Sequence, residues 1–328
     1  MQPLNPKRSA AVGLVTWLVL LLKPTADSAS TELIHRIVLF AVMVVVPWGL
    51  SLVPPSDRSG IGFWLYNIAV ALQSGGATFT FLSFFLERGT LAGAFVCGTL
   101  IVYIVIALYG VTRLISRRSL FPIAELSIDA GLIYLPVAGA WLVIYRLGIQ
   151  PFGFGEIIIL LTAVHFHFAG FATPIIAGLS GRVLSTKDHP RQIFAFVVFA
   201  IVAAMPLVAA GITLTPVVGL AGTLLLSVGL VLLAVLTIGW VRPAMTRPLG
   251  KVLLTLGALF SCLAMVLASL YAYSLATHTL IFTIPAMAMT HGILNAFGFV
   301  TCSLFAWSPI THKDLMSPKE AQLLQPRV

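Results

Sequence analysis

Long apolar runs constrain this chain more than any other feature of its sequence, because they recur from end to end with only short polar loops between them. Of the 328 residues, 59% are hydrophobic and 9% are charged, and the mean hydropathy is +1.05. Soluble domains carry about 25% charged residues, so this surface is unsuited to water. The runs are continuous rather than alternating with period two, which argues against a membrane β-barrel and predicts an all-α, polytopic transmembrane helical bundle.

We predict about ten spans, judged against the roughly 20 apolar residues that cross a bilayer; the first is short and the third is long. They cover Ala10–Leu22, Ile37–Val53, Ile61–Leu86, Leu91–Ile115, Ile123–Ile144, Ile157–Leu179, Ile193–Ile212, Pro216–Trp240, Val252–Tyr273 and Leu280–Trp307. Residues 1–307 are expected to form a single transmembrane helical domain, and residues 308–328 a short polar cytoplasmic tail. The expected location is the cytoplasmic (inner) membrane, with several passes through it.

The distribution of positive charge predicts the orientation. Of the 19 Lys and Arg residues, all but Lys23, Arg36, Arg88 and Arg146 fall on one side when the spans alternate. Positive charge collects in cytoplasmic loops, so both the N-terminus and the C-terminus are expected to be cytoplasmic. The formal charge of +9 therefore specifies topology rather than a phosphate-binding face, and we expect the lipid bilayer, not nucleic acid, as partner.

The first span allows two interpretations. Lys7 and Arg8, the apolar stretch that follows them and Ser28-Ala29-Ser30 resemble a signal peptide. Lys23 directly after the apolar stretch and the weak cleavage context favour a short retained helix instead. Either interpretation leaves the orientation of the later spans unchanged.

Several polar residues are predicted to lie deep in the membrane. His165 and His167 fall eight and ten residues into their span, and His291 falls eleven residues into the last one, with Asn295 one turn further on the same face. Asp129 lies roughly 9 Å into the fifth span. Ionisable groups at such depth usually face the bundle interior and mark function.

We therefore expect one polar pocket for a substrate or a proton. Its predicted members are Asp129, Tyr134, Thr162, His165, His167, His291 and Asn295. The alternatives are a buried hydrogen-bonded pair between Asp129 and a histidine, and Asn295 as a polar contact that holds helices together. Glu125, at i−4 from Asp129, is expected to be interfacial or to interact with the helix dipole.

His165 and His167 pose a geometric problem, because residues i and i+2 on a regular helix project about 200° apart. One histidine is then expected to face the pocket while the other bonds to a neighbouring helix, and Thr162, at i−3, favours His165 as the pocket-facing one. Alternatively the segment is irregular, since Gly170 and Pro174 make a local break plausible.

Cofactor motifs are sparse. Cys97, Cys262 and Cys302 form no Cys-x-x-Cys pair, which leaves His165, His167 and His291, with Asp129, as the candidate ligands of a Zn or Fe ion. Neither G-x-x-x-x-G-K-[ST] nor G-x-G-x-x-G occurs, so no nucleotide cofactor is expected.

Three segments carry a resemblance to a known family: H-F-H-F-A-G-F, then Met289–Phe299 (M-T-H-G-I-L-N-A-F-G-F), then I-D-A-G-L-I-Y-L from Ile128. Together they resemble the YndJ-like family of bacterial integral membrane proteins, from about Asp129 to Phe305. The resemblance implies that these segments belong together, and the family is sometimes labelled a transporter. The positions carried over are Asp129, Tyr134, Trp141, Thr162, His165, His167, Gly170, Phe171, Pro174, His291, Gly292, Asn295 and Gly298.

Three functions fit these observations. The first is a secondary transporter of a small or lipid-like solute, proton-coupled through Asp129 and a histidine. The second is a membrane-embedded enzyme acting on an isoprenoid or lipid, with Asp129 or Glu125 as general acid or with a histidine-bound metal. The third is a structural accessory subunit whose polar residues only lock helices together. The oligomeric state is not specified by the sequence.

Overall fold

The computed structural model describes residues 5–22, 29–186 and 191–308, and every regular element among them is helical. The elements assemble into ten rods, several of which join two to four helical segments end to end. In chain order they are α1 (Lys7–Leu21); α2 (Ala29–Phe40), η1 (Ala41–Val45) and α3 (Val46–Ser51); α4 (Ile61–Ser83); α5 (Thr90–Arg117); α6 (Ile123–Leu147); α7 (Glu156–His165), η3 (Phe166–Ala172) and α8 (Thr173–Leu184); α9 (Arg191–Thr213); α10 (Pro216–Leu236), η4 (Thr237–Val241) and α11 (Arg242–Ala244); α12 (Pro248–Ala276); and α13 (Ile284–Met287), η5 (Ala288–Gly292), η6 (Leu294–Thr301) and α14 (Cys302–Trp307). The short 3-10 turn η2 (Pro151–Gly153) lies in the loop before α7.

Each predicted span overlaps one rod, and the prediction of a membrane helical bundle is confirmed. Among the described residues, eight rods are long and apolar enough to cross a membrane. The other two are α1, which has only 15 residues, and α4, whose apolar pattern is interrupted by Asn67, Gln73 and Gly75-Gly76. The predicted orientation stays a prediction, and the predicted tail lies, apart from Ser308, outside the described residues.

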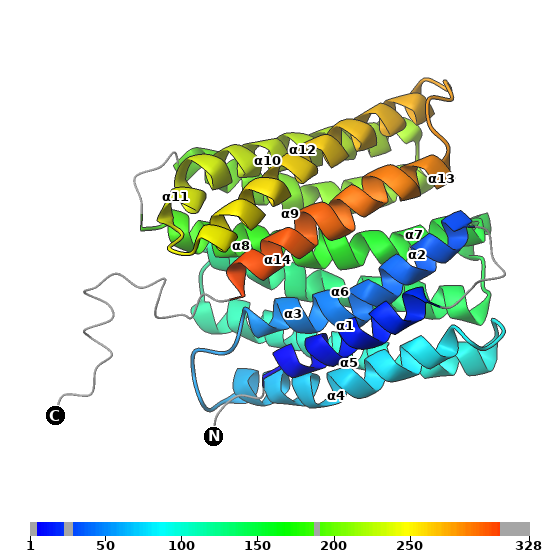
Figure 1. Ribbon diagram of the computed structural model, residues 1–328, viewed down its shortest axis with the longest axis horizontal. Coiled ribbons are helices and arrows are strands. Elements are labelled where there is room, and N and C mark those ends of the chain that lie inside the picture. Colours follow the sequence, from blue (N-terminus) through cyan, green and yellow to red (C-terminus); the bar gives the residue numbers. More distant parts are fainter. Residues whose placement is uncertain (1–4, 23–28, 187–190, 309–328) are drawn as a thin grey trace.

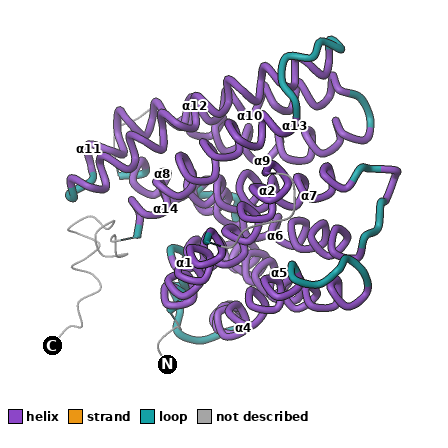
Figure 2. The backbone as a smooth tube through the Cα atoms, turned by 45° about the vertical axis from the view of Figure 1, so that its right-hand side comes forward, coloured by secondary structure: helices purple, strands orange, loops and turns teal. Residues whose placement is uncertain are grey.

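The rods lie roughly side by side along the long axis (Figure 1). Helices α4 and α5 form one flank, α9, α10 and α12 form the other, and α6 to α8 lie between them (Figures 1 and 2). We compare the buried share of the 18-residue apolar stretch in each rod. It is 72% in Glu156–Leu184 and 78% in Ala29–Ser51, against 33% in Pro248–Ala276. These two rods therefore form the centre of the bundle, while α12 presents much of its surface outward.

Helix α1 packs into this bundle rather than standing apart from it. Trp17 is buried and donates its indole N–H to the carbonyl of Arg36 over 2.7 Å. Gly13 lies directly against the backbone of Met43, where a larger residue would find no room. Whether this helix is retained or removed as a signal peptide stays a prediction.

Unusually wide turns mark several rods. Five segments of the described chain are π-helical, namely η1, η3, η4, η5 and η6. Such turns are rare and shift backbone carbonyls out of the α-helical register, so another donor must satisfy them. Gln73 on α4 donates to the carbonyl of Val42 in η1 over 2.9 Å, and Thr173 and Thr301 donate to carbonyls five residues earlier. In these rods, polar side chains donate to backbone carbonyls that the π-helical turns leave without their usual α-helical partner.

Close approach between α6 and α8 depends on a missing side chain. A Cβ atom built on Gly178 would lie 2.6 Å from the carbonyl oxygen of Ala124, which is too short for any real contact. Small residues at helix interfaces let membrane helices pack backbone to backbone. The distance between α6 and α8 therefore depends on the small size of Gly178.

We expect Gly178→Ala to destabilise the fold by about 1–3 kcal/mol, because the new methyl group must push α8 away from α6. The matched control is Gly75→Ala on α4, where nothing lies within 4 Å of the new Cβ. That change should be neutral, or stabilising by about 1 kcal/mol, since alanine is the better helix former. Thermal unfolding of both variants in mild detergent measures the difference; equal melting temperatures would show that the two helices do not pack this closely.

Candidate functional site

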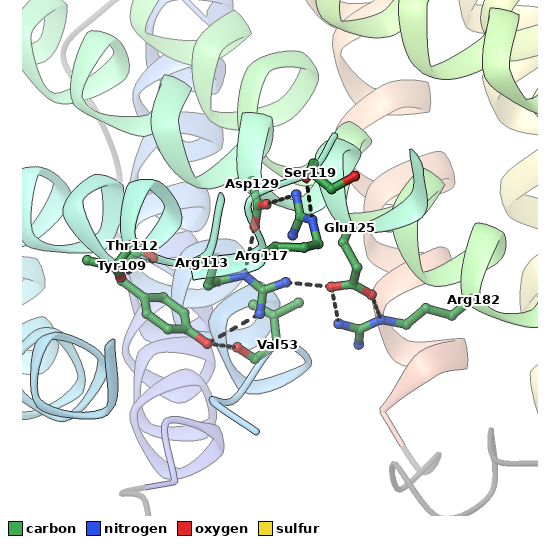
Figure 3. A network of polar contacts seen from close by, with 9 residues as sticks. All are labelled: Val53, Tyr109, Thr112, Arg113, Arg117, Ser119, Glu125, Asp129 and Arg182. Carbon is green, nitrogen blue, oxygen red and sulfur yellow. Dashed lines mark hydrogen bonds and ion pairs between the residues drawn. The ribbon is translucent and has the colours of Figure 1, made fainter. Parts of the chain in front are cut away.

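A cluster of charged side chains joins α5, α6 and α8 (Figure 3). Arg113 donates to Asp129 Oδ1 over 2.7 Å and to Glu125 Oε2 over 2.6 Å. Arg117 donates to Asp129 Oδ2 over 2.7 Å, and Arg182 donates to both oxygens of Glu125 over 2.6 and 2.9 Å. The charge cluster, defined as these five residues, carries three positive and two negative charges.

The sequence explains why these residues meet. Arg113 and Arg117 are four residues apart near the end of α5, and Glu125 and Asp129 are four residues apart near the start of α6. Each pair lies on one helical face, and the short connection between the antiparallel helices brings the faces together. Tyr109, one turn before Arg113, extends the network by donating its hydroxyl to the carbonyl of Val53 over 2.9 Å.

Every carboxylate oxygen in the charge cluster is occupied by an arginine, and the Asp129 side chain is fully buried. The structure places Asp129 with Arg113 and Arg117, to which both of its oxygens bond, and not in a buried pair with a histidine. Glu125 is likewise more than an interfacial residue, since it bridges Arg113 and Arg182. Paired carboxylates of this kind are poor proton donors, and the arrangement holds three helices together.

We expect Asp129→Asn to destabilise the protein by about 3–5 kcal/mol, because it leaves two arginines without their shared counter-charge in a buried position. Asp57→Asn, the same change at an exposed loop residue, is the matched control and should cost less than about 0.5 kcal/mol. The yield of monodisperse protein and its thermal unfolding in detergent report the difference. A stable Asp129→Asn variant would show that the cluster does not hold the fold.

His167 belongs to the packed interior and is fully buried. Its Nδ1 lies 2.8 Å from the carbonyl of Ala163, and because a carbonyl only accepts, this nitrogen carries the proton. Nε2 then accepts from the hydroxyl of Tyr103 on α5 over 2.9 Å. Both ring nitrogens are satisfied by protein, so His167 joins two helices and offers nothing to a ligand.

His165 faces away from His167, as the i,i+2 spacing predicts, and meets His291 from the last rod. The two rings lie with their centroids 6.4 Å apart and their planes 19° from parallel. His165 is exposed and His291 half-buried, although both lie well inside their rods. The structure thus brings together two of the predicted pocket residues, from separate helices.

The histidine pair, defined as His165 and His291, is held by backbone contacts on one side of each ring. Nδ1 of His165 donates to the carbonyl of Leu161 over 2.7 Å, and Nδ1 of His291 donates to the carbonyl of Ala264 on α12 over 2.9 Å. Within the described part of the chain, no hydrogen bond engages Nε2 of either ring. Each neutral imidazole therefore keeps one unused acceptor.

The structure agrees in part with both expectations for His165 and His167. One histidine faces a partner ring and the other bonds to a neighbouring helix, and the segment is also irregular, since α7 becomes the π-helical η3 immediately after His165.

Asn295 lies one turn beyond His291, and its buried Oδ1 has no hydrogen-bond partner among the described residues.

The remaining predicted pocket residues are used elsewhere. Thr162 donates to the carbonyl of Ile158 in its own helix over 2.8 Å, so it does not orient His165. Tyr134 donates to the carbonyl of Val202 on α9 over 2.8 Å, and its ring meets Phe166 edge-on. Thr162 thus bonds within α7 and Tyr134 joins α6 to α9, and of the seven predicted pocket residues the structure brings His165 and His291 together.

The predicted three-ligand metal site is not formed. Across residues 5–22, 29–186 and 191–308, no group of three or more His, Cys, Asp or Glu side chains is placed to hold a metal ion. The physical reason is the opposite projection of the two neighbouring histidines: His165 reaches His291, whereas His167 reaches Tyr103.

Comparison with known proteins places this architecture in a family. The model of the YndJ-like protein family matches residues 36–299. The chain belongs to the YndJ-like family. The match begins well before Asp129, so the resemblance extends further toward the N-terminus than the three motifs suggest. The protein is a multi-pass membrane protein, as its apolar helices also require.

One curated relative is the protein named "uncharacterized membrane protein YndJ" of Bacillus subtilis (strain 168), which is 30% identical over 201 residues. The match covers 61% of this chain but 36% of the relative, so this chain spans well under two thirds of the relative's length. No solved structure matches.

Two kinds of residue in these networks are not predicted as site residues from the sequence. The sequence presents Arg113, Arg117 and Arg182 as topology signals, but two i,i+4 pairs of opposite charge flanking a short loop also predict ion pairs between the two helices. Tyr103, the partner of His167, leaves no comparable signal, since it follows from the tertiary packing of α5 against the central rod.

We expect the two neighbouring histidines to differ in their effect on stability. His167→Ala should lower the free energy of unfolding by about 1–3 kcal/mol, because it leaves the buried hydroxyl of Tyr103 without its acceptor. His165→Ala should change it by less than about 0.5 kcal/mol, since its ring bonds only to its own helix. Thermal unfolding of the two variants, side by side, is the measurement; equal losses would contradict the separate roles.

Proposed function

We propose that this protein is a secondary carrier for a small or lipid-like solute, with the histidine pair as the place where the solute's polar group is held inside the membrane. The observation that carries the proposal is the meeting of His165 and His291, from two different rods, with one ring exposed and both Nε2 atoms unused. A polar group at this depth costs several kcal/mol unless it is paired or wet.

Irregular helices on both sides of the pair support this role. His165 ends α7 directly before η3, and His291 lies within η5, which is followed by η6. Wide turns are frequent at functional sites, and interrupted helices near the middle of the membrane are typical of carrier binding sites. His291 thus lies within π-helical backbone, and His165 lies at the last α-helical position before such backbone begins.

The other two functions have less support. Glu125 and Asp129 bond to arginines, so neither is placed as a general acid for an isoprenoid or lipid substrate. A purely structural role predicts that His165 joins helices, yet its hydrogen bond stays within α7. Proton coupling, where it occurs, would depend on the histidines alone, since Asp129 is committed to the charge cluster.

A carrier must expose its binding site to both sides of the membrane in turn. We expect His165→Cys, in a background where Cys97, Cys262 and Cys302 are replaced by Ala, to react with a charged, membrane-impermeant thiol reagent. Labelling should succeed when the reagent is added outside sealed, uniformly oriented proteoliposomes, and also when it is trapped inside them. The readout is the mass shift of the intact protein.

The matched control is Val266→Cys on α12, which is 54% exposed and lies on the outer flank of the bundle. It should stay unlabelled, because a lipid-facing thiol meets no water and forms no thiolate. Labelling of His165→Cys from one side only would contradict a carrier. Its resistance to the reagent from both sides would show that the histidine pair faces lipid.

A further inference from the structure

The histidine pair offers a ligand only one kind of hydrogen-bonding group. Nδ1 of each ring must be the donor, because its partner is a backbone carbonyl, which has no hydrogen to give. In the neutral ring the remaining nitrogen, Nε2, is then a pure acceptor. His165 and His291 are locked in the same tautomer by two different helices, α7 and α12.

A third acceptor lies on the same rod as His291. Asn295 follows it by four residues, which places the two side chains on nearly the same helical face. Its Oδ1 is buried and has no partner among the described residues. Buried polar atoms in proteins are almost always satisfied, so an unpaired one calls for a ligand, water or ion as its partner.

We infer that the polar group recognised by this protein is a donor of several hydrogen bonds that accepts none, and that a protonated primary amine is the class that fits. An ammonium group has three donors and no acceptor, which equals in number and complements in kind the three unpaired acceptors, Nε2 of His165, Nε2 of His291 and Oδ1 of Asn295. A hydroxyl group could satisfy one of these acceptors, and a carboxylate or phosphate could satisfy none. The inference rests on the proposed function and specifies its solute.

Neutral acceptors suit a carrier better than a carboxylate would. Hydrogen bonds from a charged donor are roughly twice as strong as neutral ones, so three of them compensate part of the dehydration of an ammonium group. An ion pair would add attraction but would also slow release, and transport requires that the ligand leave. The carboxylates of Glu125 and Asp129 are held by arginines on α5 and α8, so they do not compete for the amine.

The inference can be tested with three probes that share an eight-carbon chain and differ only in their head group: octylamine, octanol and octanoate. Protein labelled with ¹⁵N at histidine is placed in lipid nanodiscs at pH 7, and each probe is titrated below its membrane-disrupting concentration. Octylamine should shift the Nε2 resonances of His165 and His291. Octanoate should leave them unchanged, and octanol should bind at least about 10-fold more weakly than the amine.

His167 is an internal control, because its Nε2 already accepts from Tyr103 and should not respond to any probe. His165→Ala and Asn295→Leu should each weaken octylamine binding about 10-fold, the loss expected for one hydrogen bond to a charged group. Tyr134→Phe, which removes a hydroxyl bonded to Val202, should leave the affinity unchanged while testing for general loosening of the helices.

The outcomes separate this inference from the proposed function. Octylamine that binds at the histidine pair but does not cross proteoliposome membranes would support the solute class and contradict the carrier. Transport of octanoate, or binding of octanoate at the pair in preference to the amine, would overturn the amine inference and leave the carrier intact. Absence of any response at His165 and His291 to all three probes would overturn the inference.

Discussion

The fold depends on one constraint: inside a bilayer, every polar group of the chain must find its partner within the protein. The charge cluster is the strongest expression of this constraint, because Arg113, Arg117 and Arg182 surround two carboxylates that could not be buried alone (Figure 3). The same constraint explains the bond of Gln73 to a π-helical carbonyl and that of His167 to Tyr103. Each of these contacts ties one helix to another.

Against this background, the unsatisfied groups become informative. Among the described residues, Oδ1 of Asn295 is a buried acceptor without a partner, alongside the buried donors Nε of Arg146 and Nε1 of Trp307, and no hydrogen bond engages Nε2 of His165 or of His291. Leaving them unpaired costs free energy that the protein could have avoided with apolar residues. The cost is understandable when a ligand pairs with these atoms during function.

The sequence predicts some levels of this structure better than others. Hydropathy alone predicts the helical bundle, since the length of an apolar run reflects the thickness of the bilayer. Each predicted span overlaps one rod, although the second predicted span begins at Ile37 and its rod at Ala29. The depth of a residue in the membrane, however, does not specify which other residue its side chain contacts. His165, His291 and Asp129 lie at comparable predicted depths, yet Asp129 meets arginines because α5 and α6 are neighbours joined by a short loop. His165 and His291 are separated by more than a hundred residues along the chain, so their pairing follows only from the packing of the helices.

We propose that water reaches the histidine pair inside the bundle, where no hydrogen bond among the described residues engages either Nε2. The most direct test is water-edited solid-state NMR of ¹⁵N-histidine protein in lipid bilayers, which follows magnetisation from water to individual ring nitrogens. Magnetisation should pass rapidly to Nε2 of His165 and His291 and hardly at all to His167, whose ring is enclosed by protein. Equal transfer to all three rings, or transfer to His167 alone, would contradict it.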